Sequence, residues 1–266
     1  MSTATAEADP WAALRALRDG GDPARLPGGA LSDLFAPVLA APAAPDGCRV
    51  VGRLCQTLDG RIATASGSSQ WIGGREDILH THRLRALCHA VIVGAGTVAA
   101  DDPRLTTREV EGADPLRVVL DPSRRLGAEY RLFREGPPTL LACAADAPGS
   151  DRHGTAEVLR VPRGASGSLD LSALLRALAA RGASRVFVEG GGRTVSQFLA
   201  AGLLDRLHVT VAPVLLGSGI PSFTLPEAAR IADGLRFTWR VFPLGTDILL
   251  DIPLDRARPR ILDAAP

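Results

Sequence analysis

Short hydrophobic runs alternate with amphipathic segments along most of this chain, and their lengths separate strands from helices. Runs of about five to eight residues that are bounded by turn residues are typical of buried strands. Such runs occupy residues 49–56, 90–94, 116–121, 139–143 and 185–189. Leucines at positions 171, 174, 175 and 178 follow helical spacing instead, which predicts an amphipathic helix.

The order of these elements predicts the class of the fold. Residues 75–87 and the segment that ends at Ala201 are also helical in character. Alternating strands and helices favour an α/β domain with a mostly parallel central sheet that is flanked by helices. The last three predicted strands, at residues 205–216, 236–242 and 246–252, have no clear helix between them. We therefore expect one edge of the sheet to be antiparallel.

The first 47 residues differ from the rest of the chain. Trp11, Leu14 and Leu17 form one face of a short helix, and glycines and prolines then interrupt the pattern. A second apolar piece at residues 31–39 ends in Ala-Pro-Ala-Ala-Pro. We interpret residues 1–47 as an N-terminal arm and linker, packed on the main domain or on a partner subunit. Residues 48–266 then form the main domain, in which no internal repeat is evident.

Composition and charge exclude several classes of function. A formal net charge of +1 provides no basic surface for nucleic acid and no polybasic membrane patch. The apolar stretches are too short to span a membrane, and the N-terminus lacks the features of a signal peptide. A cytoplasmic location is therefore expected. All 30 cationic residues are arginine, so Schiff-base and P-loop chemistry, which need a lysine, are excluded.

The four cysteines do not indicate a metal site. Cys48, Cys55, Cys88 and Cys143 form no C-x-x-C pair, and no histidine lies beside one at the spacing of zinc ligands. In a cytoplasmic chain they are interpreted as buried thiols, and no metal is expected.

Two glycine-rich loops follow predicted strands. Glu189 is followed by three glycines and then a helix, and Val93 by Gly94-Ala-Gly96-Thr97 and a short helix. Glycines let a ligand approach the backbone closely, and a helix N-terminus attracts phosphate. Two such loops at the carboxyl ends of strands in one sheet form a crevice of the kind that binds nucleotides. Each loop taken alone is also compatible with a plain strand-to-helix turn.

A third segment carries turn and aromatic signals. Asp59-Gly60 indicates a turn, and Trp71 follows a loop that is rich in serine and glycine. An aromatic side chain in this place can cover a planar ring or can belong to the core. Asp101-Asp102-Pro103 likewise either contributes to a site or simply ends a helix.

Taken together and in order, these motifs resemble a known family. They are Leu58-Asp-Gly-Arg61, Ser-Gly-Ser-Ser-Gln-Trp-Ile72, Leu-Arg85-Ala, the run from Gly94 to Thr107, and Val-Glu189-Gly-Gly. They look like the reductase domain of the bifunctional riboflavin biosynthesis deaminase/reductase, which is similar in fold to dihydrofolate reductase. The resemblance extends over residues 48–252 and identifies the main domain, 48–266, as a reductase domain.

The resemblance implies NADPH as cofactor, a phosphorylated small-molecule substrate and a homodimer. Hydride would pass to the ribosyl C1 of a substrate of the 5-amino-6-(5-phosphoribosylamino)uracil type. The implied cofactor-binding residues are Cys55, Trp71, Gly94, Gly96, Thr97, Asp101, Pro122, Ser123, Gly191, Gly192, Arg193, Thr194 and Val195. The implied substrate-binding residues are Ser69, Arg85, Leu105, Arg108 and Glu189.

Elementary chemistry suggests roles for these residues. Arg85 and Arg108 offer planar cationic forks for a 5′-phosphate, and Arg124-Arg125 suit the adenosine 2′-phosphate of NADPH. We assign catalytic roles to Asp101, which would stabilise a cationic imine, and to Glu189, which would accept hydrogen bonds or relay a proton. Arg53 stands where many family members have lysine, and its pKa is too high for proton exchange.

Two other hypotheses stay open at this point. One is a reductase of the same fold that acts on another heterocycle or a pterin-like substrate, and the other is a non-catalytic nucleotide-binding protein. The sequence also lacks the H-x-E and P-C-x-x-C motifs of a zinc deaminase. We therefore expect a stand-alone reductase that binds no stoichiometric zinc and does not deaminate its substrate.

Overall fold

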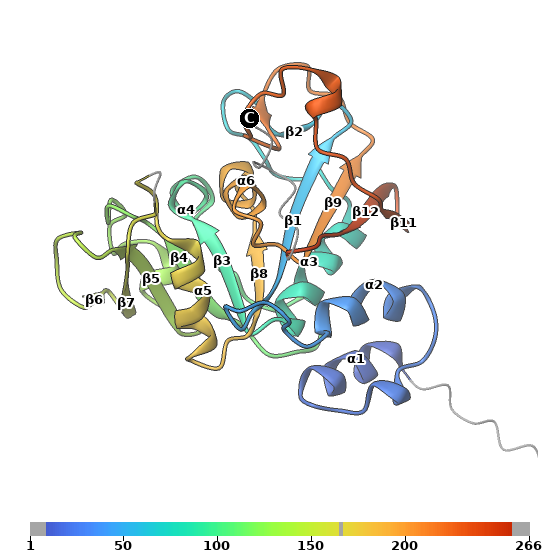
Figure 1. Cartoon of the computed structure of the whole chain (residues 1–266), viewed down its shortest axis with the longest axis horizontal. Helices are drawn as coiled ribbons and strands as arrows, with labels where there is room; N and C mark the ends of the chain where they lie inside the picture. Colours follow the sequence, from blue (N-terminus) through green and yellow to red (C-terminus); the bar gives the residue numbers. More distant parts are fainter. Residues whose placement is uncertain (1–8, 165–166, 257–266) are drawn as a thin grey trace, which may run out of the picture.

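A ten-stranded sheet forms the centre of the molecule in the computed structural model, which describes residues 9–164 and 167–256. The strand order is β11-β12-β9-β1-β8-β3-β4-β5-β7-β6. The strands from β9 to β7 in this order are mutually parallel, whereas β12, β11 and β6 pair antiparallel to their neighbours. The mostly parallel sheet with an antiparallel edge is therefore confirmed (Figure 1).

The strands of this sheet and of a separate two-stranded ribbon have the following bounds. They are β1 Arg49–Thr57, β3 Ala90–Gly94, β4 Leu116–Leu120, β5 Thr139–Ala144, β6 Arg152–His153, β7 Ala156–Val161, β8 Arg185–Glu189, β9 Arg206–Ala212, β11 Arg240–Leu244, β12 Asp247–Pro253, and, in the ribbon, β2 Arg61–Ala63 and β10 Ile220–Pro221. The strand predicted at 205–216 ends at Ala212, because Pro213 has no N–H group for the ladder.

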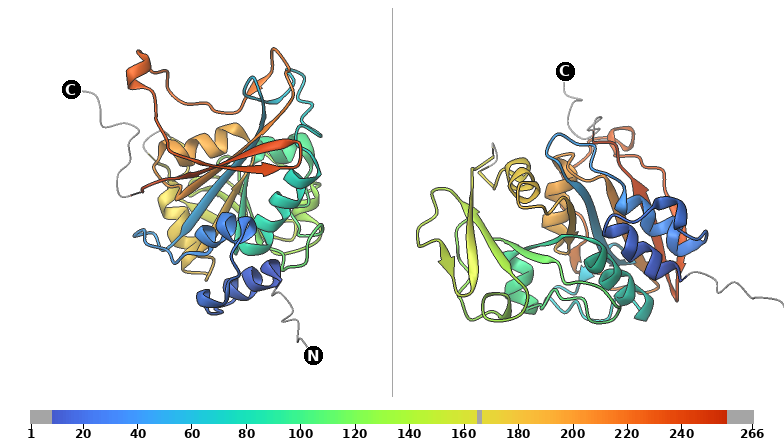
Figure 2. Two further views of the ribbon diagram at one scale, coloured as in Figure 1. Left: turned by 90° about the vertical axis from the view of Figure 1, so that its right-hand side faces the viewer. Right: turned by 90° about the horizontal axis from the view of Figure 1, so that it is seen from below.

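Helices cover both faces of the sheet. Their bounds are α1 Pro10–Arg18, α2 Ala30–Leu39, α3 Arg75–Leu87, α4 Ala95–Asp101, α5 Leu171–Ala179 and α6 Gly192–Ala200, with single 3₁₀ turns η1 Pro23–Arg25, η2 Arg131–Phe133 and η3 Ile231–Asp233. The two views of Figure 2 place α5 and α6 against one face and α3 against the other. Within the described residues, no helix is long and apolar enough to cross a membrane.

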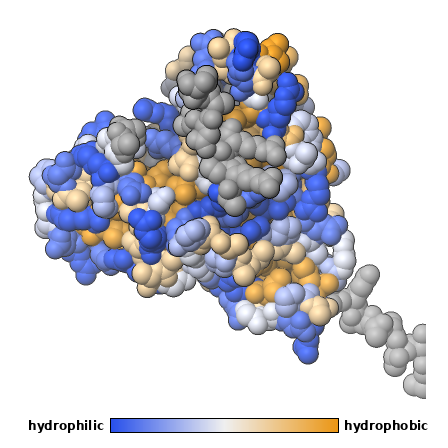
Figure 3. All heavy atoms as spheres, in the orientation of Figure 1, coloured by the Kyte–Doolittle hydropathy of each residue, from blue (hydrophilic) through white to orange (hydrophobic). Residues whose placement is uncertain are grey.

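The N-terminal arm packs on the main domain of its own chain. Leu14 of α1 and Phe35 of α2 are fully buried and belong to the same core as the central strands. The Trp11 indole donates a hydrogen bond to the Glu111 carbonyl oxygen at 3.0 Å. Hydrophobic side chains still gather on the outer surface over α1 and α2, at the lower right of Figure 3. The first eight residues of the predicted arm lie outside the described residues.

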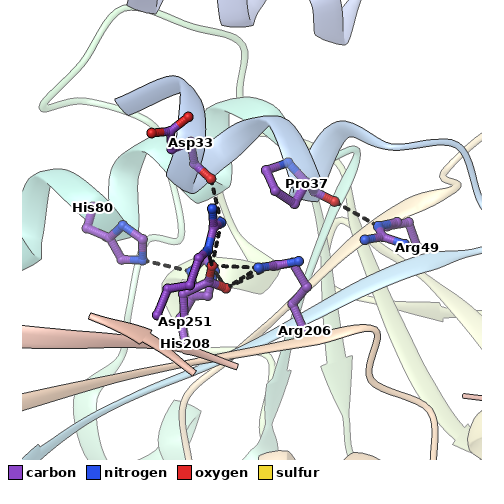
Figure 4. A network of polar contacts seen from close by, with 8 residues as sticks. Asp33, Pro37, Arg49, His80, Arg206, His208 and Asp251 are labelled. Atoms are coloured by element: carbon purple, nitrogen blue, oxygen red, sulfur yellow. Dashed lines mark hydrogen bonds and ion pairs between the residues drawn. The ribbon is translucent and has the colours of Figure 1, made fainter. Parts of the chain in front are cut away.

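A buried polar network joins α2 and α3 to the antiparallel edge of the sheet (Figure 4). The Asp251 carboxylate accepts hydrogen bonds from Arg206, with 2.9 Å between Nε and Oδ1, and from Arg240. Arg240 also donates to the Asp33 carbonyl oxygen of α2 at 2.6 Å. His208 lies 3.3 Å from Asp251 and 3.1 Å from His80 of α3. Burial alone would raise the pKa of Asp251, but hydrogen bonds from His208, Arg206 and Arg240 hold it well below its usual range.

Candidate active site

One large cavity opens at the carboxyl ends of β1, β3, β4 and β8, the end toward which β1 and β3 point in Figure 1. Its volume is about 1060 Å³. Three of the predicted residues do not line it: Ser123 is exposed nearby, Val195 is fully buried in α6, and Arg124 donates hydrogen bonds to a loop. Parallel strands bring residues far apart in sequence to the same edge, which explains why the separate motifs meet here.

The two glycine loops lie against each other in the wall of this cavity. Gly190 and Gly191 have φ angles of 73° and 66°, a region that glycine adopts without strain. A Cβ atom on Gly94 would come within 2.5 Å of Thr194 Oγ1, so any larger residue would displace the Thr194 side chain. The N-terminus of α6 has no side-chain cap, which leaves its first N–H groups available to a ligand.

Arg85 and Glu189 form a buried ion pair within the cavity. Arg85 Nε donates to Glu189 Oε2 at 2.7 Å, and Arg85 Nη2 donates to Glu189 Oε1. Arg85 Nη1 donates to the Thr106 carbonyl oxygen at 2.9 Å. Nε, Nη1 and Nη2 of Arg85 therefore all donate to protein oxygens, whereas the sequence alone predicted a guanidinium group available to phosphate.

Arg53 and Asp77 form a second ion pair beside the first. Arg53 Nη2 donates to Asp77 Oδ2, and both side chains are nearly buried. The parallel register places Arg53 of β1 opposite Glu189 of β8. The neighbouring thiol of Cys55 is protonated at neutral pH, because burial raises its pKa to about 12. The floor of the cavity thus carries two cations and two anions side by side.

Asp101, Ser69 and Trp71 also line the cavity. Burial raises the pKa of Asp101, and a hydrogen bond with Ser69 opposes part of this shift. Trp71 is 79% exposed with a φ angle of 68°, which is uncommon for a residue other than glycine. Trp71 therefore lies at the mouth of the cavity, which excludes the alternative that it belongs to the core.

The adjacent arginines 124 and 125 have different environments. Arg124 donates hydrogen bonds to the carbonyl oxygens of Pro148, Ser150 and Arg152, at 3.0, 2.8 and 3.2 Å. Arg125 lines the cavity, is exposed, and makes no hydrogen bond or ion pair with any residue that the structure describes. The prediction that both arginines face a ligand is therefore wrong for Arg124, which ties down a loop.

Sequence reasoning missed several cavity residues of α3, among them Asp77 and His82. His82 is 2% exposed, and its Nδ1 accepts a hydrogen bond from the backbone N–H of Arg108 at 3.1 Å. The available signal was helical spacing, because positions three and four residues apart share one helix face. Asp77, Thr81 and Arg85 follow that spacing, as do His82 and Arg85.

Comparison with known proteins places the chain in a family. Residues 49–240 match the family described as the RibD C-terminal domain. A Methanothermobacter thermautotrophicus protein named 2,5-diamino-6-ribosylamino-4(3H)-pyrimidinone 5′-phosphate reductase is 36% identical over 76% of this chain and 96% of its own length. The riboflavin biosynthesis protein RibD of Mycobacterium tuberculosis is 34% identical over 76% of this chain. The chain spans 53%, about half, of that RibD protein.

The fold of this chain is also similar to that of a solved structure. It is that of a diaminohydroxyphosphoribosylaminopyrimidine deaminase/5-amino-6-(5-phosphoribosylamino)uracil reductase from Thermotoga maritima. The two folds agree with a TM-score of 0.65 at 28% sequence identity, over 78% of this chain and 57% of the other. The family model and the relative that matches almost end to end agree, and this chain belongs to the RibD C-terminal domain family.

Proposed function

We propose that this protein is an NADPH-dependent reductase that transfers hydride to the ribosyl C1 of a ribosylaminopyrimidine 5′-phosphate in riboflavin biosynthesis. The observation that carries the proposal is a single cavity that joins an uncapped helix N-terminus to a group of arginines. The reductase from M. thermautotrophicus, which this chain matches over nearly all of that protein, supports the same activity.

The residues present fit a nicotinamide dinucleotide. A Cβ atom on Gly190 would meet no atom within 4 Å, so the backbone of this loop is open to close approach. The free N–H groups of α6, with Thr97 and Thr194 beside them, suit a pyrophosphate. Arg125 suits a 2′-phosphate, which distinguishes NADPH from NADH. When bound, this cofactor supplies the hydride.

The chain's own residues orient and stabilise the substrate in this proposal. Glu189, held in place by its ion pair with Arg85, accepts hydrogen bonds from hydroxyl groups of the ribosyl chain. Asp101 lines the same cavity, and in this proposal its carboxylate stabilises the positive charge that develops as the ribosylamine opens to an imine. Arg53 remains cationic beside Asp77, so it holds its place by charge and exchanges no proton.

The decisive experiment is an assay of NADPH oxidation by the purified protein. The ribosylaminopyrimidine phosphate is offered both before and after deamination of its ring, together with a pterin as an alternative ring substrate. We expect oxidation with a phosphoribosyl compound and none with the pterin. Turnover of the pterin alone would show that the protein reduces a different heterocyclic substrate. No turnover of any substrate would refute an enzymatic role.

We further propose a cytoplasmic homodimer. An apolar face on the antiparallel edge supports self-association, because Val241 and Ile248 share one face of β11 and β12 and are 55% and 49% exposed. Trp239, just before β11, is 55% exposed. Light scattering of the protein and of Val241→Asp tests this proposal. A dimer that becomes monomeric on substitution supports it, and a monomeric parent protein refutes it.

The protein is also proposed to act without zinc and without deaminating its substrate. Metal analysis and an ammonia-release assay on the purified chain test both statements. We expect less than stoichiometric zinc and no ammonia. One tightly bound zinc per chain together with ammonia release would overturn this part of the proposal.

A further inference from the structure

His82 occupies a position in the cavity wall that the proposed roles of its neighbours do not explain. It lies on α3 three residues before Arg85, is 2% exposed, and lines the cavity. Nδ1 of its ring accepts the backbone N–H of Arg108 at 3.1 Å. A neutral imidazole that accepts at Nδ1 carries its proton on Nε2. The ring therefore combines one engaged acceptor with one N–H donor.

The ring of His82 is neutral at physiological pH. Burial together with the positive charges of Arg85 and Arg108 lowers the pKa of His82 to about 4, against the opposing effect of Glu189 and Glu109. Within residues 9–164 and 167–256, the Nε2 donor has no hydrogen-bond partner. Because His82 lines the cavity, its Nε2 hydrogen is available to an acceptor atom of a ligand bound there.

The charges nearby indicate what kind of acceptor fits. Arg85 is already neutralised by Glu189, whereas the Arg108 side chain is 50% exposed and lies 3.9 Å from Glu109. We infer that His82 is a specificity-determining residue of the phosphate site, which positions Arg108 through Nδ1 and donates its Nε2 hydrogen to a phosphoryl oxygen. The inference rests on the proposed function, because it requires a phosphorylated substrate.

Two substitutions separate the two ring nitrogens. The amide of His82→Asn lies near the position of Nδ1 and keeps an acceptor for Arg108, but it removes the donor at Nε2. The amide of His82→Gln lies near the position of Nε2 and keeps the donor. We expect His82→Asn to raise KM for the phosphorylated substrate about tenfold more than KM for its dephosphorylated form, which is the low end for a hydrogen bond to a charged group. His82→Gln should retain most of this discrimination.

His89 provides a matched control. Its Nδ1 also accepts a backbone N–H, from Arg185 at 3.2 Å, and its pKa is likewise lowered to about 4. His89 does not line the cavity. His89→Asn should therefore leave both KM values unchanged. Equal effects of His82→Asn on the two substrates, or equal loss of discrimination in His82→Asn and His82→Gln, would overturn the inference.

Binding of ribose 5-phosphate, measured by calorimetry and compared with ribose, is independent of turnover. Weaker binding of ribose 5-phosphate to His82→Asn supports the inference, even where the parent protein reduces no pyrimidine and the proposed function has failed. An active parent protein that binds ribose 5-phosphate equally well with and without His82→Asn overturns the inference alone. Failure of the parent protein to bind ribose 5-phosphate more tightly than ribose also overturns it.

Discussion

Replacing Arg125 by alanine removes a cation that faces the cavity and leaves no protein group without its partner. Arg125 is exposed and has no ion pair within the described part of the chain, so no buried acceptor is orphaned. A hydrogen bond to a charged group contributes about 1.5–3 kcal/mol, or roughly ten- to a hundredfold in affinity. Solvent screening of an exposed pair favours the lower limit. We expect Arg125→Ala to raise KM for NADPH about tenfold and to leave KM for NADH unchanged.

Arg124 provides the control for this prediction. Its guanidinium donates hydrogen bonds to three carbonyl oxygens of the loop at residues 148–152, and Arg124 does not line the cavity. Arg124→Ala should lower the melting temperature by several degrees, at about 2–4 °C per kcal/mol for a chain of this size, and should preserve the preference for NADPH. Steady-state kinetics with both cofactors provide the assay. An unchanged ratio of kcat/KM for NADPH over NADH in Arg125→Ala would refute the assignment.

Three further predictions concern the substrate site and the fold. Arg108→Ala should raise KM for the phosphorylated substrate about tenfold more than for the dephosphorylated one, because its exposed side chain provides charge for the phosphate; equal effects on both would mark it as structural. Asp101→Asn should lower kcat and change the melting temperature little, whereas a large drop in melting temperature with normal kcat would identify a helix-end role. Asp251→Asn should destabilise the fold by about 3–5 kcal/mol in chemical denaturation, because it leaves Arg206 buried without its partner. The pKa of Asp251 is depressed in the folded protein, so its contribution to stability is present above the unfolded pKa of about 4 and is lost as pH falls toward the folded pKa. The parent protein should therefore melt at a lower temperature at pH 3 than at pH 7, and equal melting temperatures at the two pH values would contradict this.

The sequence predicted the centre of the sheet and missed parts of its periphery. β3, most of β4 and the interior of β8 are hydrophobic because both faces of each strand are buried. β7 was not predicted because Glu157 and Arg160 interrupt its hydrophobic pattern. The ribbon of β2 and β10 has two or three residues per strand, too few for any periodicity to appear.

The positions of site residues were predictable, but their partners were not. Strand ends and glycine loops follow from local patterns, which is why most predicted residues line one cavity. The Arg85–Glu189 pair joins residues 104 positions apart, and the Arg53–Asp77 pair joins β1 to α3. No local pattern contains such pairings, because only the packed tertiary structure determines which charges meet. The same limit applies to Arg124 and Arg125. The sequence predicted that both bind a phosphate, but in the structure Arg124 binds loop carbonyl oxygens and only Arg125 lines the cavity.

The pairing of charges divides the cavity into two zones. Arg53 and Arg85 are compensated by buried carboxylates, so the floor is nearly neutral and presents hydrogen-bonding groups instead of net charge. Arg125 and Arg193 are exposed and make no ion pair among the residues the structure describes. Phosphate groups gain most from cations that no protein anion has neutralised. These charges favour phosphates at the periphery of the cavity. That arrangement agrees with the proposed cofactor and substrate, each of which carries its phosphate away from the reacting carbon.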